Sequence, residues 1–107
     1  MIGVINGDII NSQQVDPATW LTALKGALSR NGPSPKTWEI TRGDSFQLEV
    51  SPAENVLSEA LYLKATIKSI AGLDVRMGIG IGKKTYDAPR ISEASGDAFV
   101  SSGRLFD

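Results

Sequence analysis

The 107-residue sequence predicts a mixed α/β sandwich whose strands and helices follow in the order βαββαβ. Three observations predict this class. Short β-rich segments alternate with amphipathic helical stretches, and two of the strands are joined directly by a Gly-Asp turn. Hydrophobic residues make up 41% of the chain and charged residues 21%, which is typical of a globular protein with one real core.

The first strand is expected over residues 2–10, a short β-rich run. A helix then begins at Asp16-Pro17, because Asp16 can cap its N-terminus and proline fits the first helical position. Gly32-Pro33 ends this helix. Its apolar stripe consists of Trp20, Leu21, Leu24 and Leu28.

Residues 37–50 are predicted to form a β-hairpin in which Gly43-Asp44 is a two-residue turn, since glycine suits the positive φ of such turns. The alternating residues on its two arms are Trp38, Ile40 and Arg42, then Phe46, Leu48 and Val50. The sequence Ser51-Pro52-Ala53-Glu54 has the pattern of a capping box. It predicts a second helix that ends at Gly72, with an apolar stripe of Val56, Leu57, Ala60, Leu61, Ile67 and Ile70.

The last strand of the core is expected over residues 74–82, with apolar side chains on one face and Gly78, Gly80 and Gly82 on the other. Because glycine has no side chain, the alternating glycines leave one face of the strand without side chains. Another helix, a partner chain or the last segment can then approach this face closely; a ligand is the alternative. After a loop over residues 83–91, Ser92 is expected to cap a helical segment running towards Arg104. The order describes a ferredoxin-like βαββαβ sandwich with an additional C-terminal helical segment.

The chain is expected to be one domain over residues 1–107, with a core over 1–82 and an extra segment over 83–107. Eleven basic and twelve acidic residues give a net charge of −1, so nothing favours nucleic acid or an acidic membrane. The absence of Cys and His excludes thiolate and imidazole chemistry and leaves oxygen-bound Mg²⁺, Mn²⁺ or Ca²⁺ as candidate metals. No signal peptide or membrane span is visible, which predicts the cytoplasm.

Two carboxylates stand out as a candidate metal site. Asp8 follows Gly7 near the end of the first strand, and Asp44 follows Gly43 in the hairpin turn. In a βαββαβ sheet the first and third strands are neighbours, so these two positions meet at one end of the sheet. Two carboxylates there can bind the divalent cations used in phosphoryl transfer. The alternative is that both are simple turn formers.

The sequence from Gly78 to Lys83 is neither a dinucleotide fingerprint nor a Walker loop, because its glycines alternate along a strand. Lys83 and Lys84 can either contact phosphates or remain a solvated pair.

Four blocks of sequence, in this order, resemble the bacterial SatD family over nearly the whole chain. They are Gly7–Ser12, Arg42–Gln47, Arg76–Gly82 and Gly96–Arg104. Members of that family are typically longer, with a C-terminal part similar to a helix-turn-helix. The resemblance therefore implies that this chain is the N-terminal part of a longer protein, and that any contact with nucleic acid is made by the missing part.

The same blocks are similar, more distantly, to class III nucleotide cyclase domains, which share their core with GGDEF domains. That resemblance implies a Mg²⁺ or Mn²⁺ site made by Asp8, the backbone carbonyl of Ile9 and Asp44. It implies a nucleotide ligand whose phosphates lie near Asn11 and Ser12, with Lys83 as a further candidate. It also implies a homodimer in which Arg104 stabilises the transition state across the interface; the alternative for Arg104 is a surface ion pair.

Two positions depart from the cyclase pattern. The asparagine that orients the ribose is Val100 here, and the lysine that reads the base is Ile40. The expected function is therefore a non-catalytic or weakly active nucleotide- and metal-sensing regulatory domain. A Mg²⁺- or Mn²⁺-dependent nucleotidyl-transfer enzyme is the first alternative, and a scaffold or dimerisation module is the second.

Overall fold

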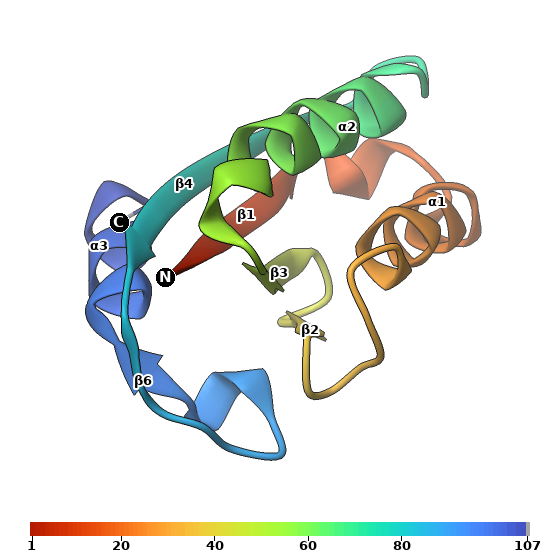
Figure 1. Cartoon of the computed structure of the whole chain (residues 1–107). Helices are drawn as coiled ribbons and strands as arrows, with labels where there is room; N and C mark the ends of the chain where they lie inside the picture. The colour runs from red at the N-terminus through yellow and green to blue at the C-terminus, as the bar shows by residue number, and fades with distance from the viewer. Residues whose placement is uncertain (107) are drawn as a thin grey trace.

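The computed structural model describes residues 1–106 and contains a four-stranded antiparallel sheet in the order β2-β3-β1-β4 (Figure 1). Asp107 lies outside the described residues. The predicted strands are confirmed, and β1 lies between β3 and β4 as expected for neighbouring first and third strands. The strands are β1 (Ile2–Ile10), β2 (Trp38–Thr41), β3 (Ser45–Val50) and β4 (Asp74–Gly82).

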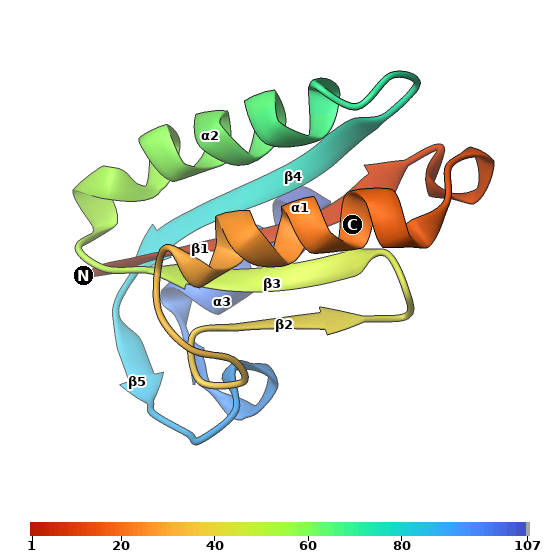
Figure 2. The same cartoon turned by 90° about the vertical axis from the view of Figure 1, so that its right-hand side faces the viewer.

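Helices cover both faces of this sheet. Helices α1 (Pro17–Ser29) and α2 (Val56–Lys68) pack on one face, and α3 (Asp97–Phe106) packs on the other (Figure 2). The main core lies between the sheet and α1 and α2, and it includes Ile5, Leu24, Leu48, Leu63 and Ile67. None of the helices within residues 1–106 has the length and apolarity that crossing a bilayer requires.

The start of α1 follows the prediction. The Asp16 carboxylate accepts a hydrogen bond of 3.0 Å from the Ala18 N–H, and Pro17 occupies the first turn, where its missing N–H costs nothing. The helix ends at Ser29, and Gly32 follows with a φ of 143°, which only glycine adopts freely.

The hairpin is confirmed, but its turn is one residue longer than predicted. Thr41 pairs with Ser45, so the loop consists of the three residues 42–44. Arg42 and Gly43 both have positive φ, 51° and 81°. The prediction of a two-residue turn was wrong because Arg42 leaves the strand conformation and becomes the first loop residue.

The capping box predicted at residues 51–54 does not form. Pro52 is extended, with φ −74° and ψ 162°, so the chain is not yet helical there. A 3₁₀ turn, Ala53–Asn55, comes next, and no side-chain hydrogen bond caps either this turn or α2. The helix therefore begins at Val56, and it ends at Lys68, four residues before Gly72.

The apolar stripe of α2 was predicted only in part. Its buried residues are Val56, Ala60, Leu63 and Ile67. Leu57 and Leu61 are 65% and 70% exposed. Each comes one residue after a buried position, which rotates it by about 100° around the helix axis. These two leucines therefore form an outward-facing apolar ridge.

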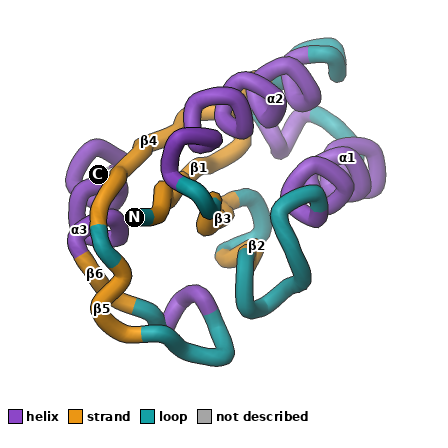
Figure 3. The backbone as a smooth tube through the Cα atoms, viewed as in Figure 1, coloured by secondary structure: helices purple, strands orange, loops and turns teal. Residues whose placement is uncertain are grey.

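The segment between β4 and α3 is more structured than a loop. Figure 3 shows two short strands there, β5 (Lys84–Tyr86) and β6 (Ser95–Gly96), which pair antiparallel. Ser92 does not cap the last helix, as the sequence suggested. It lies in a 3₁₀ turn, Ile91–Glu93, and α3 begins five residues later at Asp97.

The glycine face of β4 is covered by α3, which is one of the outcomes the sequence allowed. A Cβ atom built on Gly80 would lie 2.3 Å from the carbonyl oxygen of Ala98 and 2.5 Å from the amide nitrogen of Ser102. One on Gly82 would lie 2.8 Å from the amide nitrogen of Ala98. The helix backbone therefore rests directly on the strand, at a distance that only glycine permits.

This contact predicts a large difference between two identical substitutions. Gly80→Ala is expected to lower the free energy of unfolding by about 1–3 kcal/mol, because the backbone atoms of α3 must move to admit the methyl group. Gly26→Ala is the matched control, since Gly26 lies in α1 with open space around it. It is expected to raise stability by up to about 1 kcal/mol. Urea unfolding followed by circular dichroism measures both, and equal effects would contradict the close packing.

Candidate functional site

The two aspartates singled out in the sequence lie on directly neighbouring strands. Asp8 pairs in register with Ser45, the first residue of β3. The N–H of the next residue, Ile9, donates a 3.0 Å hydrogen bond to the carbonyl of Asp44. Because the N–H and C=O of one strand residue point the same way, the Ile9 carbonyl also faces the hairpin loop. The backbones of the three proposed metal ligands, Asp8, Ile9 and Asp44, are thus adjacent.

Each carboxylate has a polar partner of its own. Arg76, opposite Asp8 on β4, forms a salt bridge of 3.1 Å with the Asp8 carboxylate. The Ser12 hydroxyl donates a 2.8 Å hydrogen bond to Asp44. Sequence reasoning placed Ser12 at this site but did not anticipate that it bonds to Asp44, nor that Arg76 pairs with Asp8.

The chain after β1 turns sharply and forms a small hollow beside Asp44. Asn11 has a left-handed φ of 67°, and its amide donates to the carbonyl of Gly72. A 3₁₀ turn, Ser12–Gln14, follows. The hollow has a volume of about 230 Å³ and is lined by Ile9, Asn11, Ser12, Gln13, Gln14 and Asp44. Asn11 and Ser12, the predicted phosphate contacts, therefore both line this hollow beside Asp44.

A second hollow adjoins Asp44 on the side of α1. Its volume is about 440 Å³, and Pro17, Trp20 and Leu21 give it an apolar wall. The indole N–H of Trp20 is buried and has no hydrogen-bond partner among the described residues. Asp44 is shared by both hollows, so a ligand that reached its carboxylate would contact polar groups on one side and an apolar wall on the other.

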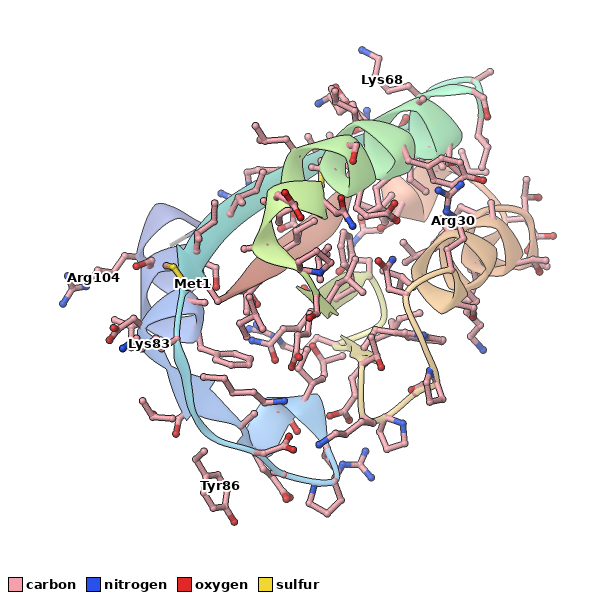
Figure 4. All side chains as sticks on the ribbon, viewed as in Figure 1. Met1, Arg30, Lys68, Lys83, Tyr86 and Arg104 are labelled. Atoms are coloured by element: carbon pink, nitrogen blue, oxygen red, sulfur yellow. The ribbon has the colours of Figure 1, made fainter. Side chains whose placement is uncertain are left out.

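The other two candidate residues lie elsewhere. Lys83 follows β4 at the end where Gly82 pairs with Ile2, six strand residues from Asp8, or about 20 Å. The structure therefore does not bring Lys83 to the two aspartates. Arg104 is exposed on the last turn of α3 and projects outward, as Figure 4 shows.

The donor set at this end of the sheet fits a divalent cation in kind. Asp8, the Ile9 carbonyl and Asp44 supply hard oxygen ligands, which Mg²⁺ and Mn²⁺ prefer. Within residues 1–106 no three acidic side chains gather into a ready-made metal cluster. Asp8 lies on the α3 face of the sheet beside Arg76, whereas Asp44 bonds to Ser12 and lines the hollows on the α1 side. One cation would therefore reach both carboxylates only around the end of the sheet, and it would depend as well on backbone oxygen, water and the ligand's own phosphates. It would also have to compete with Arg76 for Asp8.

A cleft of about 330 Å³ lies on the α3 face of the sheet, and no sequence pattern predicted it. It is bounded by the sheet, by Phe99 and Gly103 of α3 and by Ser92 of the 3₁₀ turn. At its edge, the Asn6 amide donates a 2.7 Å hydrogen bond to the buried hydroxyl of Ser102, which fastens α3 to β1. Its other polar groups come from Glu39, Thr41, Arg42, Ser45 and Gln47.

Glu39 connects β2 to the segment that precedes α3. Its carboxylate is buried and accepts hydrogen bonds from the Arg90 guanidinium at 2.6 Å and from the Ser92 N–H at 3.1 Å. Burial opposes ionisation, but the hydrogen bonds from Ser92 and Arg90 outweigh it and hold the pKa of Glu39 below its ordinary value of 4.5. No spacing rule relates residues 39, 90 and 92, so sequence reasoning missed this network; a charged residue in a predicted apolar strand was the only signal.

A second ion-pair cluster fixes the same segment further out. Lys36 and Lys84 both contact Asp87, and together they lower its pKa to about 2. Lys84 also reaches Glu49 at 2.9 Å, which joins β5 to β3. Of the two lysines that the sequence raised as phosphate contacts, Lys84 is therefore occupied by structural pairs.

Comparison with known proteins adds no identification. No protein-family model matches the chain, and no curated protein matches its sequence. The site must therefore be interpreted from its own geometry.

The Glu39 network predicts a pH-dependent contribution to stability. Because the folded-state pKa lies below the unfolded value, the ionised carboxylate stabilises the fold above about pH 4.5, and this stabilisation is lost as the pH falls through the lowered value. Glu39→Gln should lower the free energy of unfolding at pH 7 by about 1.5–3 kcal/mol, the range for hydrogen bonds to a charged group. It should also lose less stability than the wild type between pH 6 and pH 3.

Denaturant unfolding at several pH values measures both effects. Glu93→Gln is the control, because Glu93 lies in the same turn but is exposed, and its effect should stay within about 0.5 kcal/mol. Parallel pH profiles for the wild type and Glu39→Gln would show that the network contributes nothing.

Proposed function

We propose that this chain is a regulatory domain that senses a nucleotide together with Mg²⁺ or Mn²⁺, and that it binds this ligand with little or no turnover. The proposal includes the ferredoxin-like, cyclase-type fold and the relation to the SatD family. The observation that carries it is the adjacency of Asp8, Ile9 and Asp44, held by the Ile9–Asp44 hydrogen bond.

The topology supports the fold part of the proposal. The first 82 residues follow the order βαββαβ, and their sheet has the order β2-β3-β1-β4 with antiparallel neighbours. This is the arrangement of a split βαβ fold, in which each helix connects two strands that are not adjacent.

Two positions support binding without efficient chemistry. The side chain of Ile40 packs against the hydrophobic core, so it offers no polar group for reading a base. Val100 on α3 is 54% exposed, and its side chain cannot donate or accept a hydrogen bond to a ribose. A metal-dependent nucleotidyl transferase would need other residues for both tasks.

Calorimetry tests the binding part directly. Mn²⁺ with ATP or with GTP is titrated into the wild type and into Asp44→Asn. The asparagine keeps an oxygen that can accept the Ser12 hydrogen bond, so the fold should persist while the negative charge is lost. We expect measurable heat for at least one nucleotide with the wild type and affinity reduced by about tenfold or more in Asp44→Asn, consistent with loss of a charged metal ligand.

A matched control separates the site from overall charge. Glu54→Gln removes one negative charge from the turn before α2, next to the start of β1 and far from Asp44, and should bind like the wild type. Absence of heat in every protein, or equal heats in all three, would refute the proposal. Release of pyrophosphate or a cyclic nucleotide during the same incubation would favour the enzyme instead.

A further inference from the structure

The outer edge of β4 is an interaction surface that the nucleotide proposal does not use. β4 is the last strand of the four-stranded sheet, and within residues 1–106 it pairs only with β1. It is nine residues long, and long open edges are normally shortened, covered or charged, because they offer unpaired backbone groups to any passing strand.

The pairing register shows which backbone groups face outward. Ile9 bonds to Asp44 across the β1–β3 ladder, so Ile9 points away from β4. Its partner on β4, Val75, must therefore direct its own N–H and C=O to the outer edge. The same alternation applies along β4 and places the outward groups on Val75, Met77, Ile79 and Ile81.

Only the first of these positions is blocked by side chains. The Val75 N–H donates to the Asp74 carboxylate at 2.7 Å, and its carbonyl accepts from the Lys64 ammonium at 3.0 Å. No comparable side-chain bond is found at Met77, Ile79 or Ile81 among the described residues. Three consecutive outward positions thus remain available for an added strand.

An apolar groove runs beside this open edge. It has a volume of about 530 Å³ and lies between α2 and β4, lined by Leu57, Ala60, Leu61, Lys64, Val75, Arg76, Met77 and Ile79. Leu57, Leu61 and Ile81 are each about half exposed or more, although they are large and apolar. Exposed apolar side chains gathered next to open backbone groups mark a site for a partner.

The charges around the groove indicate what kind of partner fits. Lys64 is the cationic side chain on the α2 side of the groove, whereas the Arg76 guanidinium pairs with Asp8 on the opposite face of β4. Lys68 lies close to Lys64, and the two lysines share one aspartate, Asp74, which leaves a net positive charge beside the groove. A second copy of the chain would place one cationic groove against another, whereas acidic residues on a partner would complement it.

We propose that the outer edge of β4 binds an extended, acidic segment of another polypeptide by β-strand addition. The backbone of that segment would pair with Met77, Ile79 and Ile81. Alternate side chains would point towards α2 and fill the groove beside Leu57 and Leu61, so the segment alternates apolar and acidic residues. This surface is separate from Asp8 and Asp44, and the proposal does not depend on the nucleotide hypothesis.

A fluorescently labelled peptide of sequence EVEVEVE serves as the probe, with KVKVKVK as the matched control of opposite charge. Fluorescence anisotropy with the full chain is expected to show binding of the acidic peptide, weakened by salt, and much weaker binding of the basic one. Ile81→Pro removes an outward N–H without breaking the β1 ladder and should weaken binding about tenfold. Ile81→Val keeps that N–H and should bind within about twofold of the wild type.

Leu61→Ser tests the groove itself. Leu61 is 70% exposed, so its substitution should leave folding intact while weakening the peptide complex. Circular dichroism checks that each variant is folded. Equal binding of both peptides, no binding of the acidic peptide, or unchanged binding by Ile81→Pro and Leu61→Ser would overturn the proposal. A dimer in sedimentation velocity that Ile81→Pro dissociates would overturn it too, by assigning the edge to a second copy.

Discussion

The contact between the glycine face of β4 and the backbone of α3 determines much of what surrounds it. Because Gly80 and Gly82 have no side chains, α3 lies almost directly on the sheet, and the Ser102 hydroxyl can reach Asn6 on the next strand. The helix packs mainly on β4 and β1. The Glu39–Arg90–Ser92 network holds the 3₁₀ turn Ile91–Glu93 against β2. A cleft remains between this turn and α3. Larger side chains at the glycine positions would lift α3 and remove the Asn6–Ser102 bond.

The sequence predicted the core of the fold well, because its signals are local. The Asp16-Pro17 start of α1 and the alternation along β4 both follow from the stereochemistry of a few consecutive residues. The failures have the same origin. The pattern at residues 51–54 resembles a capping box, yet the extended Pro52 places those residues before the helix. The periodicity of α2 is compatible with two overlapping stripes, and only packing against the sheet decides that Leu63 is buried while Leu61 is not.

At the candidate site, the proximity of the backbone positions could be predicted from the sequence, but the partners of the side chains could not. Strand order follows from the βαββαβ sequence, so the proximity of Asp8 and Asp44 along neighbouring strands could be inferred. Which side chains bond to these two carboxylates depends on the register of strand pairing. Arg76 reaches Asp8 because β1 and β4 align them as cross-strand neighbours, and a shift of one residue would place them on opposite faces. Contacts between residues fifty or more apart, such as Glu39 with Arg90, leave no local pattern to read.

Arg76 lies between the two surfaces for which functions are proposed, and the alternation of β4 keeps them apart. Its side chain lies on the same face of the strand as Gly78 and Gly80, where it pairs with Asp8. The side chains of Val75, Met77 and Ile79 lie on the opposite face, towards α2 and the groove. A cation at Asp8 would compete with Arg76 for that carboxylate, since one carboxylate cannot fully satisfy both charges. The charge that a partner meets in the groove would instead be set by Lys64 and Lys68, which share Asp74. The two proposed binding events therefore use opposite faces of one strand and different charged residues.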